Sequence, residues 1–352
     1  MKKTLIALTL AALPVASMAD VILYGQIKAG VEVAQTKVTV GGKTTKDHAT
    51  TEIADFGSRI GFKGSESLGS GLNAIWQVEN DISVAGGGTW AGRDSFIGLD
   101  GNFGKVRAGR LSTQLNDMDT LDPWEYSNDA LGLGVYTRTG ERVVSVRYDT
   151  PNFAGFSANV QFTPRDNQSN TGRDDAGRSD TSAYYAGLNY ENSGFFAQYG
   201  AGYSPSSYTA LSGQSKSGQV HRLEGGYDAN NLFVGVGVQY GKGWETSNDY
   251  MAALGYDAGV GADTGVETTE AAVTAAYRFG NVTPRVSYAH GWESKIAGDK
   301  VAGSKYDQVV LGADYDFTKR TTAMVSAGWL RAGKSNDKTE TTAGLVGVRH
   351  KF

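Results

Sequence analysis

Five acidic side chains are gathered in one stretch of the sequence, Leu111 to Gly140, which lacks the alternation of polar and apolar residues seen on either side of it. An insert of about thirty residues without regular structure is usually functional or disordered. We expect this acidic stretch to fold back between strands whose facing side chains are basic, although a solvated surface loop is the alternative. The acids that would face these bases are Asp117, Asp119, Asp122, Glu125 and Asp129.

The bases that would face these acids share the polar side of alternating segments. Carboxylates and bases on opposite sides of a water-filled space create a transverse field, which selects solutes by charge without a bond-making step. Arg110 and Arg142 fall on the other parity, near predicted strand ends, and the pattern does not decide which way their side chains point. The candidate wall bases are Lys28, Arg59, Lys63, Lys105, Arg107 and Arg147.

Other chemistry is poorly supported. The four histidines show no metal-ligand spacing, and no G-x-S-x-G nucleophile motif is present. Gly86 to Ala91 resembles a dinucleotide-binding pattern but has no strand and helix around it. Asp117, Asp119 and Asp122 could hold calcium, yet the glycine and distal glutamate of an EF-hand are missing. We therefore predict no enzyme, cofactor or metal site, and the formal net charge of −4 argues against a nucleic-acid partner.

Most of the chain alternates with a period of two residues. Val21, Leu23, Ile27 and the residues that continue their parity are apolar, while the positions between them are largely polar. Such a segment is a strand with one apolar and one polar face. The pattern recurs along the chain, except at Arg93 to Asp100, where neither parity is convincingly apolar. High glycine (48) and tyrosine (18) with little proline (6) also favour β-structure.

The breaks between these strands alternate between short and long. Seven tight turns with both chain ends on one side give sixteen strands, and short turns opposite long loops are the topology of an outer-membrane barrel. The short breaks are Ser65 to Gly71, Gly101 to Gly104, Thr150 to Gly155, Asn192 to Gly194, Asp228 to Asn231, Gly280 to Thr283 and Thr318 to Arg320. Long breaks lie between them, as in Lys37 to Thr51, Arg165 to Asp180, Ser204 to Ser217, Gly241 to Glu267, Trp292 to Ser304 and Ala332 to Glu340.

The physical cause of this pattern is the membrane. In hydrocarbon every backbone N–H and C=O must be paired inside the protein, so the strands must close into a ring. A closed sheet has a lipid-facing and a lumen-facing surface, and nearly all strand charges share the inward parity. Aromatic residues also cluster just before the tight turns, as in an interfacial girdle: Tyr148, Tyr190, Tyr227, Phe279 and Phe317.

The first nineteen residues predict export. Lys2 and Lys3 precede an apolar run from Leu5 to Ala12, and Ser17 to Ala19 form a small-residue cleavage site. We expect a signal peptide over residues 1–19 and a single transmembrane barrel domain over residues 20–352. Neither the leader nor any later run is long and apolar enough for a spanning helix. The chain contains no cysteine, so its stability depends on packing and hydrogen bonding.

Several stretches resemble the neisserial outer-membrane porins, a type of Gram-negative general-diffusion porin. They include Ala19 to Glu32, Phe56 to Gly64, Ser145 to Asp149, Tyr277 to Asn281 and Val348 to Phe352, and the resemblance covers the whole chain. It implies a homotrimer of sixteen-stranded antiparallel barrels in the outer membrane, whose third loop narrows a passage for ions and small hydrophilic solutes.

The same resemblance carries further expectations. The acidic stretch, which contains Asp122-Pro123-Trp124, is by position the third loop, and its acids favour a weak preference for cations. The terminal Phe352 on an amphipathic strand would be the signal read by the outer-membrane assembly machinery. Besides this partner, the barrel would contact membrane lipid. The alternative function is a structural barrel or adhesin with a plugged lumen.

Overall fold

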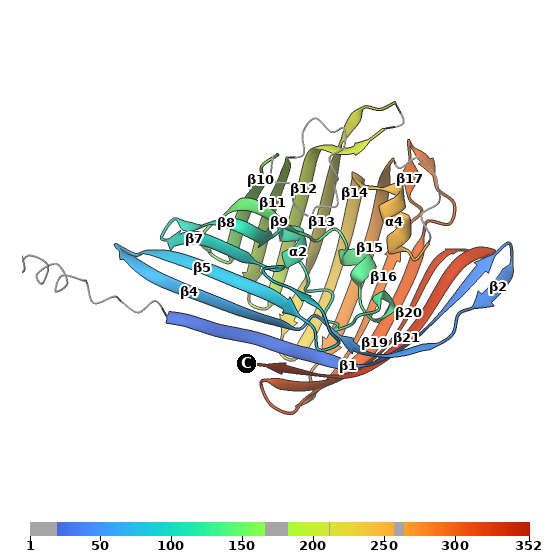
Figure 1. Ribbon diagram of the computed structural model, residues 1–352, viewed down its shortest axis with the longest axis horizontal. Helices are drawn as coiled ribbons and strands as arrows, with labels where there is room; N and C mark the ends of the chain where they lie inside the picture. The colour runs from blue at the N-terminus through green and yellow to red at the C-terminus, as the bar shows by residue number, and fades with distance from the viewer. Residues whose placement is uncertain (1–19, 166–181, 211, 257–263) are drawn as a thin grey trace, which may run out of the picture.

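The computed structural model describes residues 20–165, 182–210, 212–256 and 264–352. They form a closed, antiparallel β-barrel of sixteen strands (Figure 1), as the alternating breaks predicted. The leader predicted over residues 1–19 lies outside the described residues. Among the residues that are described, no helix is long and apolar enough to cross a membrane.

The barrel strands follow one another around the ring in chain order. The first half comprises β1 (Asp20–Val40), β3 (Thr50–Asp55) continued by β4 (Arg59–Gly69), β5 (Leu72–Ile82), β7 (Ser95–Gly101), β8 (Gly104–Ser112), β9 (Arg142–Asp149), β10 (Phe156–Thr163) and β11 (Ala183–Asn192). The second half comprises β12 (Phe195–Thr209), β13 (Ser215–Ala229), β14 (Leu232–Thr246), β15 (Gly265–Tyr277), β16 (Val282–Gly291), β19 (Tyr306–Asp316), β20 (Thr321–Lys334) and β21 (Asp337–Lys351).

Pairing of the first and last strands closes the ring. β1 runs antiparallel to β21 from Gln26 opposite Lys351 to Thr39 opposite Lys338. On its other edge β1 pairs with both β4 and β3, which together act as one barrel strand. Short strands in the loops complete the set: β2 (Lys43–Lys46), β6 (Gly88–Thr89), β17 (Lys295–Ile296) and β18 (Asp299–Lys300). Closure leaves no unpaired edge in the barrel wall, as an apolar bilayer requires.

The two faces of the wall differ as the sequence predicted. On β14, Val234, Val236 and Val238 point outward and are exposed, while the next residue, Gln239, is buried inside the barrel. The stretch from Arg93 to Asp100 proves to be regular as well, because Ile97 and Leu99 of β7 point outward. Outward aromatic residues contact one another in tilted or edge-to-face pairs beside the tight turns: Phe156 with Tyr190, Phe195 with Tyr227, Tyr277 with Phe279, and Tyr315 with Phe317.

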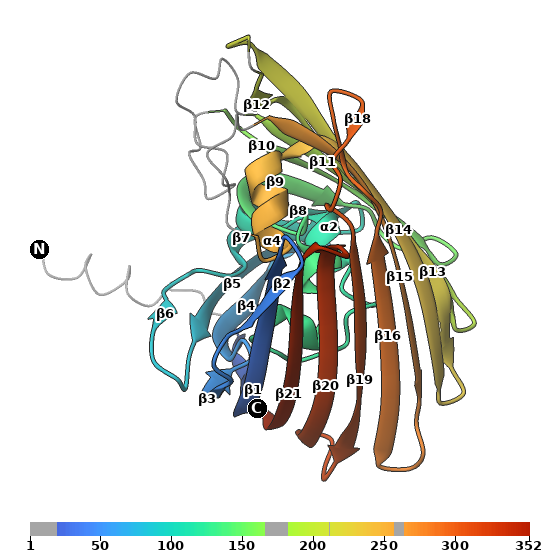
Figure 2. The same ribbon diagram turned by 90° about the vertical axis from the view of Figure 1, so that its right-hand side faces the viewer.

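Several breaks are shorter than the sequence predicted. Ala332 to Glu340 is almost entirely strand, and Ser204 to Ser217 and Ser65 to Gly71 also lose most of their length to strands. Gly241 to Glu267 contains the ends of β14 and β15 and a capped helix, α4 (Ser247–Ala253). The ladder between β20 and β21 continues to Lys334 opposite Asp337, beyond the residues whose alternation marked the strands. Figure 2 shows these two strands side by side. The break from Arg165 to Asp180 lies almost wholly outside the described residues.

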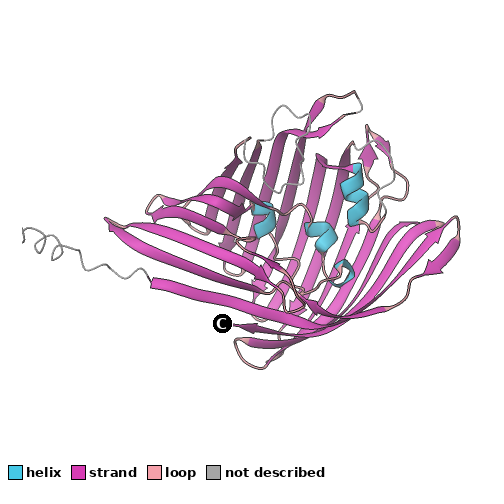
Figure 3. Ribbon diagram, in the orientation of Figure 1, coloured by secondary structure: helices cyan, strands magenta, loops and turns pink. Residues whose placement is uncertain are grey.

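Residues 113–141, here called the inner segment, connect β8 to β9. The acidic stretch was expected to begin at Leu111, but Leu111 and Ser112 end β8. It was also expected to lack regular structure, whereas it contains three short helices (Figure 3): α2 (Gln114–Asp117), the 3-10 helix η1 (Asp129–Leu131) and α3 (Gly134–Thr137). The Thr113 and Asn128 side chains cap the first two by accepting backbone N–H groups.

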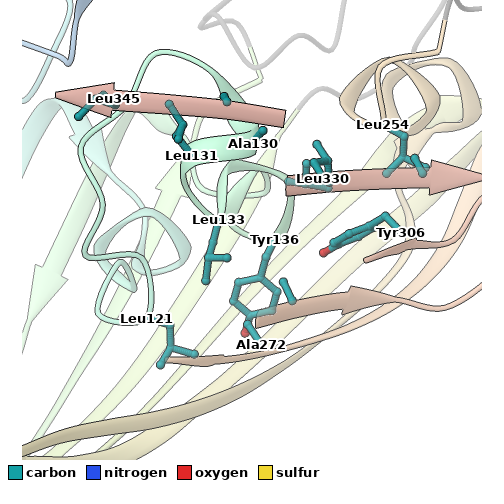
Figure 4. Packing of buried hydrophobic residues seen from close by; sticks show 14 of the residues in the cluster. Leu121, Ala130, Leu131, Leu133, Tyr136, Leu254, Ala272, Tyr306, Leu330 and Leu345 are labelled. Atoms are coloured by element: carbon teal, nitrogen blue, oxygen red, sulfur yellow. The ribbon is translucent and has the colours of Figure 1, made fainter. Parts of the chain in front are cut away.

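The inner segment supplies much of the apolar interior. Leu121, Leu131, Leu133 and Tyr136 are fully buried and belong to one cluster with inward residues of the wall (Figure 4). The wall residues of this cluster include Met324, Leu330, Ala343 and Leu345 on the last two strands. The inward face is therefore not polar throughout, because part of it receives the inner segment.

Candidate functional site

Ion pairs fix both ends of the inner segment to the wall. Near its start, Asp117 accepts a hydrogen bond of 2.7 Å from Arg147 on β9. Near its end, Arg138 donates to Glu245 on β14 and to Glu270 on β15, each at 2.7 Å. The Glu270 side chain is fully buried, so its charge depends on Arg138 for compensation.

The middle of the inner segment reaches strands on the far side of the ring. Glu125 accepts hydrogen bonds from Lys28 on β1 at 2.5 Å and from Arg349 on β21 at 2.9 Å. Lys28 and Arg349 stand opposite each other in the ladder that closes the barrel. Two residues further on, the Ser127 N–H donates to Glu32, also on β1. One carboxylate thus joins the inner segment to the seam of the barrel.

Neutral contacts hold the inner segment between these charges. Trp124 donates its indole N–H to the Ser287 hydroxyl at 2.8 Å, and Thr274 donates to the Leu121 carbonyl at 2.6 Å. The wall offers glycine where the approach is closest. A Cβ at Gly235 would lie 2.5 Å from Leu121 Cδ2, so β14 needs glycine there to seat the inner segment.

A cavity of about 570 Å³ remains beside the inner segment. Its charged lining contains as many acids as bases. The bases are Lys28, Arg59, Arg278, Arg285, Arg349 and Lys351, and the acids are Asp119, Asp122, Glu125, Asp228, Asp314 and Asp316. A second cavity of about 300 Å³ shares Arg59 and Asp119 with the first and is lined also by Glu79, Arg93, Asp117 and Arg142. Asp119 and Arg59 therefore stand at the boundary between two polar spaces.

The five predicted acids have different surroundings. Asp117 and Glu125 are in the ion pairs described above, and Asp119 borders both cavities. Asp122 lines the larger cavity but accepts hydrogen bonds from the Leu133 N–H and the Tyr126 hydroxyl. Burial raises the pKa of Asp122 to about 6. Asp129 is not among the residues lining either cavity, and burial raises the pKa of its carboxyl.

The six predicted bases are also dispersed. Lys28 and Arg59 line the larger cavity, whereas Arg147 is committed to Asp117 and Asp149. Arg107 pairs with Asp149 at 2.6 Å, and Lys63 lies over the Tyr24 ring. Lys105 is half-exposed and 3.9 Å from Asp100, beside a tight turn. None of Lys63, Lys105, Arg107 and Arg147 is among the residues lining the two cavities.

Sequence reasoning missed several charged residues of the site. Arg278, Arg285, Arg349 and Lys351 lie on late strands and turns, where the polar parity that pointed to the early bases marks them as well. Arg142, whose side-chain direction the sequence left undecided, lines the smaller cavity and donates to Asp94 at 2.8 Å. Arg110 donates to the Gly92 carbonyl.

A closed barrel with an apolar outer belt and charged inner cavities defines a transmembrane channel protein. The family model for Gram-negative porins matches residues 28–352, and the chain belongs to that family. It is 54% identical to the major outer membrane protein P.IB of Neisseria sicca and 48% identical to that of Neisseria gonorrhoeae, in both cases over the whole of both chains. These relatives and the fold place it in the outer membrane.

Solved structures share the fold at low sequence identity. The Salmonella typhi OmpF complex with daunomycin matches with a TM-score of 0.68 and 20% identity, covering 95% of this chain and 98% of that one. The trimer form of in-vitro folded OmpT from Vibrio cholerae matches with a TM-score of 0.64 and 14% identity, covering 95% and 99%. At these identities the likeness shows the barrel fold alone.

Proposed function

We propose that this porin is a homotrimeric, water-filled channel for passive diffusion of ions and small hydrophilic solutes, narrowed by its inner segment. The observation that carries the proposal is the 570 Å³ cavity, which is lined by acids of the inner segment together with bases of the wall. Such a cavity sieves by size and steers by charge, with no catalytic step and no cofactor.

The distribution of ion pairs sets the field within this cavity. Glu125 lies between Lys28 and Arg349 and balances one of their two positive charges. Arg278 pairs with Asp316 at 3.2 Å. Asp119 and Asp122 form no salt bridge with any other described residue, so their charges act on the solution in the cavity. We propose that these two acids of the inner segment give the channel a weak preference for cations. Arg59, 3.9 Å from Glu79, faces the same solution as the opposing positive charge.

Planar-bilayer recording tests the channel. We expect stepwise conductance in groups of three, one step for each subunit of a trimer, and the trimer form of the OmpT neighbour supports this assembly. The absence of conductance would refute the proposal. Uptake of small sugars into liposomes separates a channel from a structural barrel or adhesin with a plugged lumen, which would admit none.

The C-terminal residue, Phe352, is placed where it could take part in assembly of the barrel. Phe352 exchanges backbone hydrogen bonds with Gly25 at 3.1 and 3.2 Å, and its ring lies over that glycine. We propose that the outer-membrane assembly machinery reads Phe352 before this pairing forms. Deleting Phe352 should lower the amount of folded barrel in cells severalfold while leaving refolding into detergent nearly unchanged. Equal losses in both assays would show that Phe352 acts through stability alone.

The leader is tested separately. We propose that residues 1–19 are a signal peptide removed on export, so that the barrel domain of residues 20–352 remains. N-terminal sequencing of protein isolated from the outer membrane should begin at Asp20, and retention of Met1 would refute the assignment.

A further inference from the structure

Arg222, on the inward face of β13, is fully buried and saturated with hydrogen bonds. Its Nε donates to the Gln239 side chain at 2.9 Å. One terminal nitrogen donates to the carbonyls of Leu115 and Met118 at 3.0 and 3.2 Å. The other donates to the Tyr136 carbonyl at 3.2 Å and to the Thr139 hydroxyl at 2.8 Å. A guanidinium has five N–H donors, and all five are used.

The partners of Arg222 come from both arms of the inner segment. Leu115 and Met118 belong to the arm that leaves β8, and Tyr136 and Thr139 belong to the arm that returns to β9. Three of the acceptors are backbone carbonyls, which fix the path of the chain irrespective of side-chain identity. Thr139 also donates to Gln239 at 2.7 Å, so β13, β14 and both arms form one hydrogen-bonded network.

The ion pairs of the inner segment do not duplicate this arrangement. Arg147 fixes only the start, Arg138 only the end, and Glu125 only the middle. Each of these pairs ties one point of the inner segment to the wall. Arg222 alone among these residues joins the two arms to each other, which is what keeps the segment between them at a fixed distance from the wall.

We propose that Arg222 is the positioning residue of the channel: it holds the two arms of the inner segment together and thereby fixes the bore and the placement of Asp119 and Asp122. This inference rests on the proposed function, in which the inner segment narrows the passage. Without Arg222, three buried carbonyls lose their donors and must turn or take up water, because unpaired buried acceptors are unfavourable. The inner segment then samples more than one position.

Substitutions at Arg222 test the proposal in single-channel recordings. Arg222→Gln should open with several current levels within one subunit and with open-channel noise severalfold above that of the unsubstituted protein. Arg222→Lys keeps the charge but has three donors in place of five, so its noise should also exceed that of the unsubstituted protein. Lys242→Gln is the matched control, because it removes a positive charge from an exposed position on the neighbouring strand β14 and leaves all five donors of Arg222 in place.

A reversible cross-link separates loss of positioning from general damage. A Cβ added at Gly187 on β11 would lie 2.5 Å from Gln114 Cγ, and the chain has no cysteine of its own. Combining Gln114→Cys and Gly187→Cys with Arg222→Gln therefore permits a disulfide between α2 and the wall. The disulfide fixes only the first arm to the wall, so oxidation should lower the noise of Arg222→Gln without bringing it fully to the level of the unsubstituted protein. Reduction should raise the noise again. A merely weakened barrel would not respond in this way.

If Arg222→Gln conducts at one level with unchanged noise, or if oxidation leaves its noise unaltered, the inference is wrong while the channel function stands. If Arg222→Gln forms no barrel, Arg222→Lys decides, and noise equal to that of the unsubstituted protein overturns the inference. If the unsubstituted protein itself does not conduct, the proposed function fails instead.

Discussion

Asp119→Asn is the most direct test of charge selection in this channel. The carboxylate borders both cavities and forms no salt bridge with another described residue, so the substitution removes charge without breaking an ion pair. Asparagine also preserves the shape of the side chain. The change should disfavour cations and favour anions in equal measure.

The size of the effect follows from the size of the cavity. A sphere of 570 Å³ has a radius of about 5 Å, at which two unit charges in water interact by about 0.8 kcal/mol. Screening at an ionic strength of about 0.1 M reduces this to about 0.5 kcal/mol. Because a cation loses this energy while an anion gains it, the difference is about 1 kcal/mol, or about a fivefold change in the cation-to-anion permeability ratio.

The measurement is the zero-current potential across a salt gradient in a planar bilayer. Burial raises the pKa of the Asp119 carboxyl above its ordinary value, so the potential is measured at several pH values. Asp299→Asn is the control, since Asp299 is exposed on β18 and is not among the residues lining either cavity. A zero-current potential for Asp119→Asn equal to that of the control would refute the placement of Asp119 in the ion path.

Three further predictions concern the inner segment. Since burial raises the pKa of Asp122 to about 6, its carboxyl gains a proton as the pH falls through this value; cation preference should then fall by a similar factor, and Asp122→Asn should abolish the transition. Arg138→Gln leaves the fully buried Glu270 unpaired and should lower the free energy of unfolding by about 3–5 kcal/mol, measured by urea titration in detergent. Gly235→Val places methyl groups against Leu121, should cost about 1–3 kcal/mol, and should change the single-channel conductance as the inner segment shifts.

Lys105→Gln is the control for Arg138→Gln, and Gly344→Val is the control for Gly235→Val. Lys105→Gln removes a half-exposed pair at 3.9 Å and should change the free energy of unfolding by about 0–1 kcal/mol. Gly344→Val adds its side chain on the outer face, where the nearest atom to a Cβ is Ser326 O at 3.9 Å, and should leave conductance unchanged. The prediction for Asp122 is contradicted if the cation preference does not vary near pH 6. The prediction for Arg138→Gln is contradicted if its free energy of unfolding falls no more than that of Lys105→Gln. The prediction for Gly235→Val is contradicted if its conductance equals that of Gly344→Val.

The barrel was predictable because the membrane imposes one rule on every strand. Apolar residues must face lipid at each second position, as Val234, Val236 and Val238 do, and the alternation of short and long breaks then gives the strand number. Strand ends were less predictable, as in Ala332 to Glu340. There the ladder of hydrogen bonds continues after the apolar belt ends, and backbone pairing leaves no mark on residue type.

The sequence by itself determined the fold, the inward parity of the wall bases and the stretch that holds the acids. Tertiary structure decided which charges meet, because Glu125 binds two bases far from it in the chain, on β1 and β21. It also decided the function of Arg222, which by parity is only one more inward base. Parity specifies the direction in which a side chain points, whereas its partners depend on how the inner segment folds within the closed ring.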